Sequence, residues 1–252
     1  MDPTTALGLV VLALSVGIYG TIIGAGGGFI VVAGLVVLFD LSGATAVGTS
    51  VITTLFIHVS GAFNYNRKGL VDRPTAGWFS AGSVPVAFVS AAFLASRIPQ
   101  RTFELLIGAL LLSLAVFVLV RPSVEAQYNG QLPPRRKELL SSGAALGVLS
   151  GAFGVGSGLI TVPLVAWIQK LATHRATATT SAIGAVSGMS AASGHIIAGN
   201  PRWSFLPFLI VGAVIGGRIG SNGAERLSST TVRALIAGGL LATAIPLLLR
   251  AL

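Results

Sequence analysis

The sequence contains no cysteine and few charged residues. Charged side chains make up 9% of the 252 residues, and only 7 of them are acidic. Soluble domains carry about a quarter charged residues, because their surfaces must stay hydrated. Hydrophobic residues make up 53% of the chain, and the mean hydropathy is +0.88. The lack of cysteine excludes disulfides and thiolate metal sites. The lack of charge predicts an all-α integral membrane protein whose surface faces lipid.

The net charge of +9 would suggest nucleic-acid binding in a soluble protein. In a membrane protein the same excess is expected, because Lys and Arg accumulate in cytoplasmic loops. Nucleotide motifs also fail: Phe29 and Ile30 follow the first glycine run, where a P-loop needs Lys and then Ser or Thr. A Rossmann fingerprint would need glycine in place of Phe29. We therefore expect a lipid bilayer as partner, no nucleic acid, no cofactor and no metal.

A glycine-rich motif occurs twice in the chain. Residues 24–30 (GAGGGFI) return as residues 154–160 (GVGSGLI), and Thr49-Ser50 returns as Thr180-Ser181. Repeated landmarks at a nearly constant separation indicate a tandem duplication. We expect transmembrane repeats over residues 1–120 and 139–252, joined by a polar cytoplasmic linker over residues 121–138.

Each half combines one long apolar segment, interrupted by glycine, with three ordinary spans. The interrupted segments cover residues 6–39 and 139–168. The ordinary spans cover approximately residues 43–65, 75–96, 102–120, 175–198, 203–224 and 230–249. If each interrupted segment turns back at its glycines as a re-entrant hairpin, the two halves are inverted. Most basic residues, including Arg67, Arg136 and Arg175, then share one side, which the positive-inside rule favours over eight parallel spans. Both termini are then outside the cell.

The two glycine breaks form the candidate site. Non-helical backbone inside a bilayer needs protein or a water-filled cavity around it, and paired broken helices mark transporter sites. The first turn of the following half-helix offers unpaired N–H groups and the positive end of its dipole, which favour an anion. The candidate binding residues are Gly26, Gly27, Gly28, Thr49, Ser50, Gly156, Ser157, Gly158, Thr180 and Ser181.

Each candidate residue also has a structural interpretation. Glycine lets helices pack closely, as we expect for the stripes Gly212/Gly216/Gly220 and Ser83/Ala87/Ala91/Ala95. Ser and Thr hydroxyls in membrane helices commonly donate to carbonyls of their own helix. His58 and His195 lie within predicted spans, and either a proton-coupling role or a structural hydrogen bond fits them. No Asp or Glu lies in mid-span, which disfavours a cation pathway. Neutral donors suit an anion that must bind and then leave.

The motifs taken together resemble the TauE/SafE sulfite exporter family. The first half carries the Gly-x-Gly-Gly-Gly break, the Thr-Ser pair and residues 66–72 (NRKGLVD). The second half carries residues 154–163 (GVGSGLITVP) and 194–199 (GHIIAG). The resemblance covers essentially the whole chain. It implies a secondary transporter of the inner membrane that exports small sulfur-containing or organic anions, such as sulfite, thiosulfate or a sulfonate. The chain departs from the pattern at Ala33, where proline is common, and at Ser157, which replaces a glycine.

Two alternatives to a transporter fit parts of the pattern. An anion channel would conduct without saturation, whereas a carrier saturates, and a membrane scaffold would move no solute at all. An intramembrane serine protease would use Ser157 with His195 as its base, and the two must then lie within hydrogen-bond reach. The rhomboid-like motif Gly-x-Ser-Gly needs glycine where Val155 stands. We therefore expect no enzymatic activity.

Overall fold

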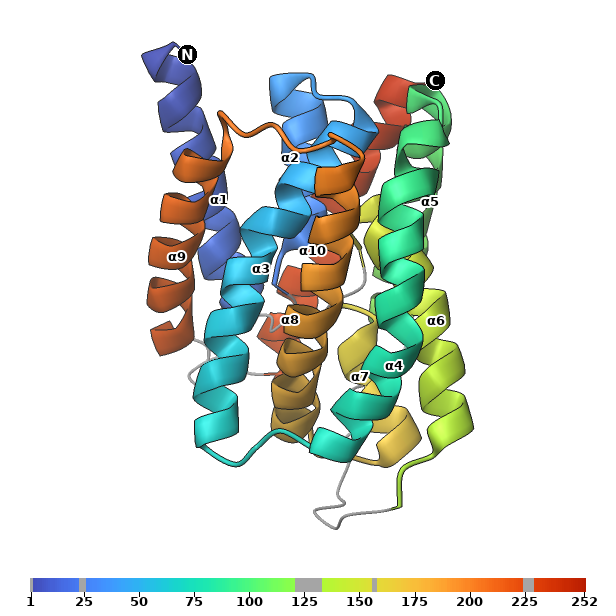
Figure 1. Cartoon of the computed structure of the whole chain (residues 1–252). Helices are drawn as coiled ribbons and strands as arrows, with labels where there is room; N and C mark the ends of the chain where they lie inside the picture. Colours follow the sequence, from blue (N-terminus) through green and yellow to red (C-terminus); the bar gives the residue numbers. More distant parts are fainter. Residues whose placement is uncertain (1, 23–25, 121–132, 156–157, 224–228) are drawn as a thin grey trace.

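The structure is a computed structural model that describes residues 2–22, 26–120, 133–155, 158–223 and 229–252. In these residues the chain is almost entirely helical and contains no strand. The helices lie side by side in one bundle, and both chain ends lie at the upper end of it in Figure 1. The prediction of an all-α protein is confirmed.

Several helices are suited to a lipid environment. Five segments within the described residues are long and apolar enough to cross a membrane: Pro3–Gly20, Gly43–Arg67, Arg73–Arg97, Gln100–Val120 and Ala234–Ala251. Large apolar side chains also lie exposed on the outside of the bundle, among them Leu7, Phe63, Trp167 and Leu249. Such a surface is stable in lipid and unfavourable in water. The chain is therefore a multi-pass membrane protein.

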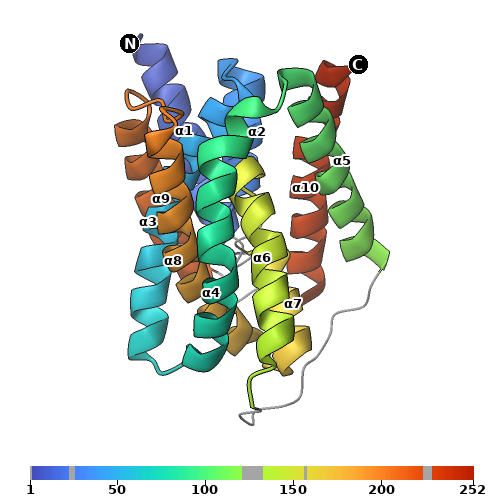
Figure 2. The ribbon, with the colours of Figure 1, turned by 45° about the vertical axis from the view of Figure 1, so that its right-hand side comes forward.

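The first half begins with two helices that run in opposite directions. Helix α1 (Pro3–Ile22) descends from the upper end to the middle of the bundle, and α2 (Gly28–Phe39) returns to the upper end (Figures 1 and 2). Helices α3 (Gly43–Arg67), α4 (Arg73–Val89) and α5 (Gln100–Val120) then run down, up and down. A π-helical turn (Ser90–Leu94) and a 3-10 turn (Ala95–Arg97) extend α4.

The second half repeats this order from the opposite end. Helix α6 (Arg136–Phe153) rises from the lower end to the middle, and α7 (Thr161–Gln169) returns to the lower end (Figure 2). Helix α8 (Thr173–Ile197) then runs up, α9 (Leu206–Gly223) runs down and α10 (Ser229–Ala251) runs up. Each helix of the second half therefore runs opposite to the helix at the same place in the first.

The helices of the two halves match at a constant shift of 130 residues. Helices α3 and α8 each contain 25 residues and begin at Gly43 and Thr173. Left-handed residues precede both helices at the same shift, Asp40 with φ 53° and Lys170 with φ 51°. At this shift Thr49 corresponds to Thr179 and Ser50 to Thr180. The pairing of Thr49-Ser50 with Thr180-Ser181 was therefore wrong by one residue.

Close contacts at glycine join the two halves. In the α4–α6 pair, Gly82 lies against the carbonyl of Leu140, and Gly147 lies against the carbonyl of Ser83. In the α1–α9 pair, Gly212 lies against the carbonyl of Val10, and Gly17 lies against that of Ala213. The two pairs of contacts correspond at the 130-residue shift. Gly82 and Leu140 correspond to Gly212 and Val10, and Gly147 and Ser83 correspond to Gly17 and Ala213. At each of these glycines an added Cβ would lie under 3.0 Å from a backbone oxygen, so a side chain does not fit. The packing role predicted for Gly212 and Gly216 is confirmed.

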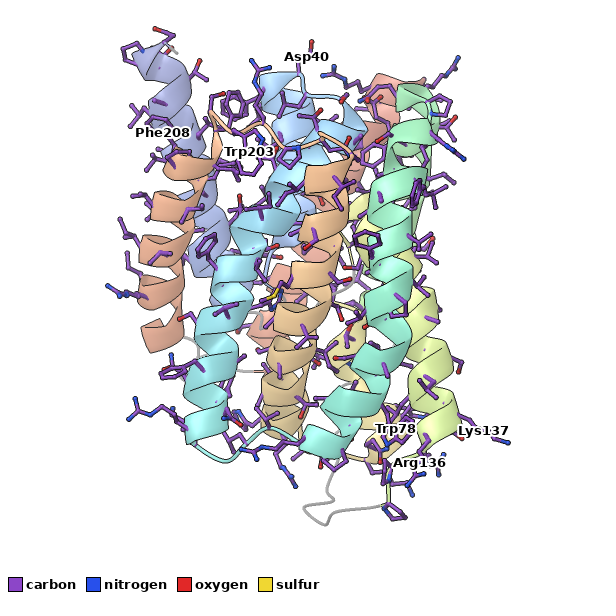
Figure 3. The ribbon with its side chains drawn as sticks, in the orientation of Figure 1. Asp40, Trp78, Arg136, Lys137, Trp203 and Phe208 are labelled. Carbon is purple, nitrogen blue, oxygen red and sulfur yellow. The ribbon has the colours of Figure 1, made fainter. Side chains whose placement is uncertain are left out.

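Charged residues gather at the two ends of the bundle, and the ends differ (Figure 3). The lower end, where α3 ends and α6 begins, holds Arg67, Lys68, Arg73, Arg135, Arg136, Lys137, Lys170 and Arg175. The lower end also holds the acidic Asp72 and Glu138. The upper end holds Arg97, Arg101, Arg202 and Arg250, together with the acidic Asp2, Asp40 and Glu104. The Arg136 guanidinium lies 4.9 Å from the centre of the Trp78 ring at the lower end. The lower end is therefore the more basic one.

A first prediction concerns the glycine contacts. Gly82→Ala places a Cβ against the Leu140 carbonyl and should cost about 1–3 kcal/mol in the free energy of unfolding, the usual cost of overpacking. Gly77→Ala, in the same helix, is the matched control because nothing lies within 4 Å of its Cβ. Thermal unfolding in detergent measures both. Equal melting temperatures for the two variants would contradict this account of the packing.

Candidate functional site

The two helical breaks meet in the middle of the bundle. A Cβ on Gly28, the first residue of α2, would lie 3.0 Å from the carbonyl oxygen of Gly154, which follows α6. Gly26, Gly27 and Gly154 have φ values of 68°, 69° and 65°. Glycine adopts this left-handed conformation without a steric penalty. The glycines therefore allow each hairpin to turn back where it contacts the other.

Ser50 on α3 holds the first break in place. Its hydroxyl donates a hydrogen bond of 2.9 Å to the carbonyl oxygen of Gly28, and the side chain is fully buried. A carbonyl without a partner inside a bilayer would cost several kcal/mol, on the order of 2–7. Thr54, one turn further along α3, donates to the Ser50 carbonyl and places its methyl group beside Gly28. The polar groups of α3 at this level thus stabilise the break.

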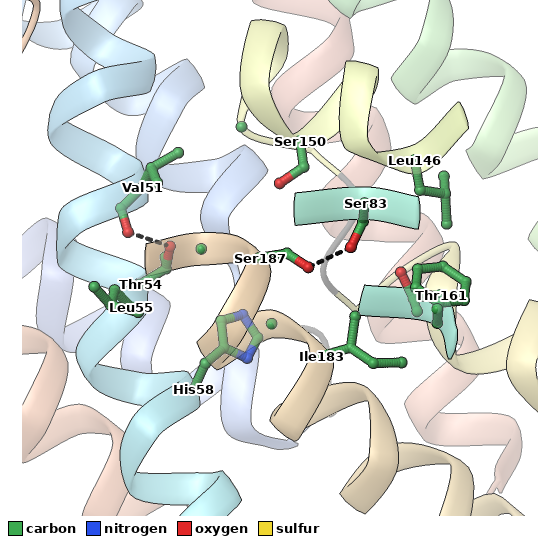
Figure 4. Close-up of a pocket in the computed structure, with 14 residues that line it drawn as sticks. Val51, Thr54, Leu55, His58, Ser83, Leu146, Ser150, Thr161, Ile183 and Ser187 are labelled. Carbon is green, nitrogen blue, oxygen red and sulfur yellow. Dashed lines mark hydrogen bonds between the residues drawn. The ribbon is translucent and has the colours of Figure 1, made fainter. Parts of the chain in front are cut away.

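A small cavity lies beside the breaks (Figure 4). It has a volume of about 30 Å³, which is room for about two water molecules. Helices α3, α4, α6, α7 and α8 line it, together with Gly154 of the second break. None of the described residues that line it is charged. Its polar residues are Thr54, His58, Ser83, Ser150, Thr161 and Ser187.

Hydroxyl groups from separate helices face each other across this cavity. The Oγ atoms of Ser83 on α4 and Ser187 on α8 are 2.5 Å apart, and both side chains are buried (Figure 4). Ser150 lies one turn before the end of α6, and Thr161 is the first residue of α7. The cavity therefore collects hydrogen-bonding groups at the N-terminus of α7, where the helix dipole is positive.

The ring of His58 fits between the first break and α8. A Cβ on Gly26 would lie 2.8 Å from His58 Nε2, and a Cβ on Gly184 would lie 2.8 Å from His58 Nδ1. Both positions must therefore be glycine for the ring to occupy this place. His58 is 6% exposed and lines the cavity. It is the one titratable side chain among the described residues of the cavity wall.

Thr49 forms a contact between the halves instead of lining the cavity. Its hydroxyl accepts the backbone N–H of Arg202, at 2.9 Å, in the segment that follows α8. Thr179, at the 130-residue shift, accepts the backbone N–H of Asp72, at 3.0 Å, in the segment that follows α3. Arg202 and Asp72 are themselves related by the same shift. Helix α3 thus binds the segment that follows α8 at one end of the bundle, and α8 binds the segment that follows α3 at the other end.

The remaining candidates that the structure describes are not among the residues that line the cavity. The Thr180 hydroxyl is buried and has no hydrogen-bond partner among the described residues. Ser181 donates to the Thr177 carbonyl of its own helix. The carbonyl of Gly158 accepts the Val162 N–H in the first turn of α7. His195 is fully buried, and its Nδ1 lies 2.9 Å from the amide nitrogen of Asn200, outside the cavity lining. Gly156 and Ser157 lie outside the described residues.

The polar residues of this cavity have no polar counterparts at the 130-residue shift. At the 130-residue shift its polar residues correspond to small or apolar ones: Gly184 for Thr54, Gly188 for His58, Ala213 for Ser83, Gly20 for Ser150, Val31 for Thr161 and Ile57 for Ser187. The sequence analysis, which relied on the repeat, therefore missed five of the polar cavity residues: Thr54, Ser83, Ser150, Thr161 and Ser187. The available signal was that Ser150 and Thr161 flank the second glycine run.

These features define a class of protein: a multi-pass membrane protein with two broken helical segments that meet at a small polar cavity, as in membrane transporters. The chain matches the sequence model of the family described as "Sulfite exporter TauE/SafE" over residues 9–247, and it belongs to that family.

Related proteins carry matching names. The probable membrane transporter protein YunE of Bacillus subtilis is 28% identical over 247 residues, which covers 89% of this chain and 90% of YunE. YdhB of the same organism, also named a probable membrane transporter protein, is 28% identical over 232 residues, covering 90% and 94%. The probable membrane transporter protein y4hK of Sinorhizobium fredii is 23% identical and covers 97% and 99%. The relatives are thus named as transporters and not as enzymes. No solved structure matches this chain.

A second prediction concerns the two threonines that bind the loops. Thr49→Val removes the acceptor for the Arg202 N–H, and Thr179→Val removes the acceptor for the Asp72 N–H. Thr179→Val should lower the free energy of unfolding by about 1–3 kcal/mol, the cost of an unsatisfied buried donor. Thr49→Val should lower it by less, because Arg202 is exposed. Amide exchange should accelerate near residue 202 in the first variant and near residue 72 in the second.

Thr53→Val is the matched control for both variants. Thr53 is equally buried, and its hydroxyl donates to the Thr49 carbonyl of its own helix. We expect unchanged amide exchange at both loops in this variant. Faster exchange at both loops in all three variants would indicate general destabilisation and contradict the specific contacts.

Proposed function

We propose that this protein is a secondary transporter that exports a small sulfur-containing or organic anion, such as sulfite, thiosulfate or a sulfonate, across the cell inner membrane. The observation that carries the proposal is the hydroxyl-lined cavity, without Lys, Arg, Asp or Glu among its described lining residues, beside the two helical breaks. Hydroxyl and backbone N–H donors hold an anion without a permanent ion pair, so it can also leave. Membership of the TauE/SafE family agrees with this proposal.

We further propose that the halves are inverted repeats over residues 1–120 and 139–252, each with one re-entrant hairpin. The opposite directions of matching helices and the reciprocal glycine contacts support it. The more basic lower end would then face the cytoplasm, with the linker over residues 121–138 on that side. Both termini would be outside the cell.

In this proposal the small size of the cavity requires a change of conformation during transport, which leads to alternating access. An oxyanion such as sulfite is larger than the space for about two water molecules, so the cavity must widen before it binds. The two hairpins approach the cavity from opposite ends of the bundle, and widening on either side would admit the anion from that side. A carrier of this kind saturates and shows counterflow, whereas an anion channel would conduct in linear proportion to the gradient.

The proposed binding groups include residues that the sequence singled out and residues of the cavity. Gly26, Gly27, Gly28 and Gly158 would shape the breaks, and Ser150, Thr161 and Ser187 would donate to the anion. Of the two histidines, His58 has the position for proton coupling, because it lines the cavity. His195 is engaged with Asn200 and would have a structural role.

The transport assay provides a third prediction. Purified protein in proteoliposomes should take up labelled sulfite with saturation and counterflow. Ser150→Ala and Ser187→Ala should each lower uptake by about tenfold or more, because hydrogen bonds to a charged group are worth about 1.5–3 kcal/mol. Ser193→Ala is the matched control, because Ser193 is an exposed residue of α8 that donates to its own helix. Normal uptake in both cavity variants would refute the assignment of the site.

The orientation in the membrane provides a fourth prediction. Because the chain has no cysteine, single introduced cysteines report their own location without background. In intact cells a membrane-impermeant maleimide should label Ser204→Cys, an exposed position at the upper end, and should spare Lys137→Cys at the lower end. Labelling after cell lysis controls for reactivity. The reverse pattern in intact cells would contradict the proposed orientation.

A further inference from the structure

The cavity combines hydroxyl groups with the absence of a fixed positive charge among the described residues that line it. The described residues that line it are Ser, Thr, Gly and apolar residues, together with His58. Two arginines form ion pairs at the ends of the bundle, away from the cavity. Arg175 binds Asp72 at 3.5 Å, and Arg250 binds Glu104 at 3.2 Å and also contacts Asp40. None of the described residues that line the cavity is Lys or Arg.

The electrostatic cost of entering such a cavity depends steeply on the charge of the anion. The cost of moving an ion from water into a medium of low dielectric constant rises with the square of its charge, so a dianion costs about four times as much as a monoanion. Hydroxyl donors offset only part of this cost. Some of the donors in this cavity are already engaged, because Thr54 donates to the Ser50 carbonyl and Ser83 is bonded to Ser187.

His58 provides at most one positive charge. The polar groups that face the cavity with it are Thr54 on α3, Ser83 on α4, Ser150 on α6, Thr161 on α7 and Ser187 on α8, and none of them is charged. The glycines Gly26 and Gly184 flank the ring. A protonated imidazole and a monoanion form a neutral pair, whereas a dianion leaves one uncompensated negative charge. The corresponding positions of the other repeat are apolar or glycine, so they supply no second charge.

We propose that this cavity selects singly charged anions, so that sulfite is carried as hydrogensulfite and sulfonates as monoanions, while sulfate and thiosulfate are rejected. The inference rests on the proposed function and narrows it. It also assigns His58 a role in charge compensation. The occupied site then holds a monoanion beside a protonated His58, and the net charge of this pair is zero.

The experiment is competition on the wild-type protein in proteoliposomes. Labelled sulfite uptake is measured with methanesulfonate, sulfate or thiosulfate as competitor at equal concentration and constant ionic strength. We expect methanesulfonate to compete at least about tenfold more strongly than either dianion, because the uncompensated charge is costly in this site. Uptake of sulfite should also rise as the pH falls and the hydrogensulfite fraction grows.

The outcomes separate the two proposals. Equal competition by dianions and monoanions would overturn the charge selection and leave the transport function standing. A folded protein that moves none of these anions would overturn the proposed function and this inference with it. Because selectivity is measured on the wild type, the result does not depend on whether a variant folds.

A histidine variant tests the role of His58 separately. The charge of methanesulfonate does not change between neutral and mildly acidic pH, so any pH dependence of its uptake comes from the protein. We expect this pH dependence in the wild type and its loss in His58→Gln, a neutral side chain of similar size. Asn66→Gln, at an exposed position near the end of the same helix, is the control. Unchanged pH dependence in His58→Gln would refute the role of His58.

Discussion

Two stretches of backbone leave the helical conformation in the middle of a protein whose surroundings offer no water. Their N–H and C=O groups must find partners inside the protein, because lipid provides none. This constraint explains why the two breaks lie together, why Ser50 on α3 donates to the Gly28 carbonyl, and why left-handed glycines carry the turns. The central helices enclose the breaks, and the cavity is the space that remains beside them.

The glycine contacts connect the halves in a crossed arrangement. Helix α1 of the first half packs against α9 of the second, and α6 of the second packs against α4 of the first. At these contacts the backbones approach too closely for any side chain. A rigid rotation of residues 1–120 against residues 139–252 would break both contacts. Units that move as rigid bodies must therefore combine helices of both halves, with α1 moving together with α9 and α4 together with α6.

The sequence predicted the membrane class and the location of the helices well, because both depend on composition and on glycine. Helix α2 begins at Gly28, within the first glycine run, and α8 covers Thr173–Ile197 where residues 175–198 were expected. The site was harder to predict. Ser83, Ser150 and Ser187 come together from three helices whose rotation is set by glycine contacts far along the chain. His58 and His195 look alike in sequence, and only their neighbours distinguish them: Gly26 and Gly184 for one, Asn200 for the other.

The two hairpins differ in the residues that contact them. At the upper end Arg250 on α10 donates to the Val36 carbonyl on α2 and pairs with Asp40 and with the buried Glu104. At the 130-residue shift the corresponding positions are Val120, Lys170 and Ala234, which cannot form this cluster. Helices α6 and α7 contribute Ser150 and Thr161 to the polar cavity, whereas the corresponding residues of α1 and α2 are Gly20 and Val31. Ion pairs thus anchor the hairpin of α1 and α2, while the hairpin of α6 and α7 lacks the corresponding cluster. Without such a cluster, a movement of the α6–α7 hairpin breaks fewer ion pairs and has a lower energetic cost. This is also the hairpin that lines the cavity, through Thr161 in the first turn of α7.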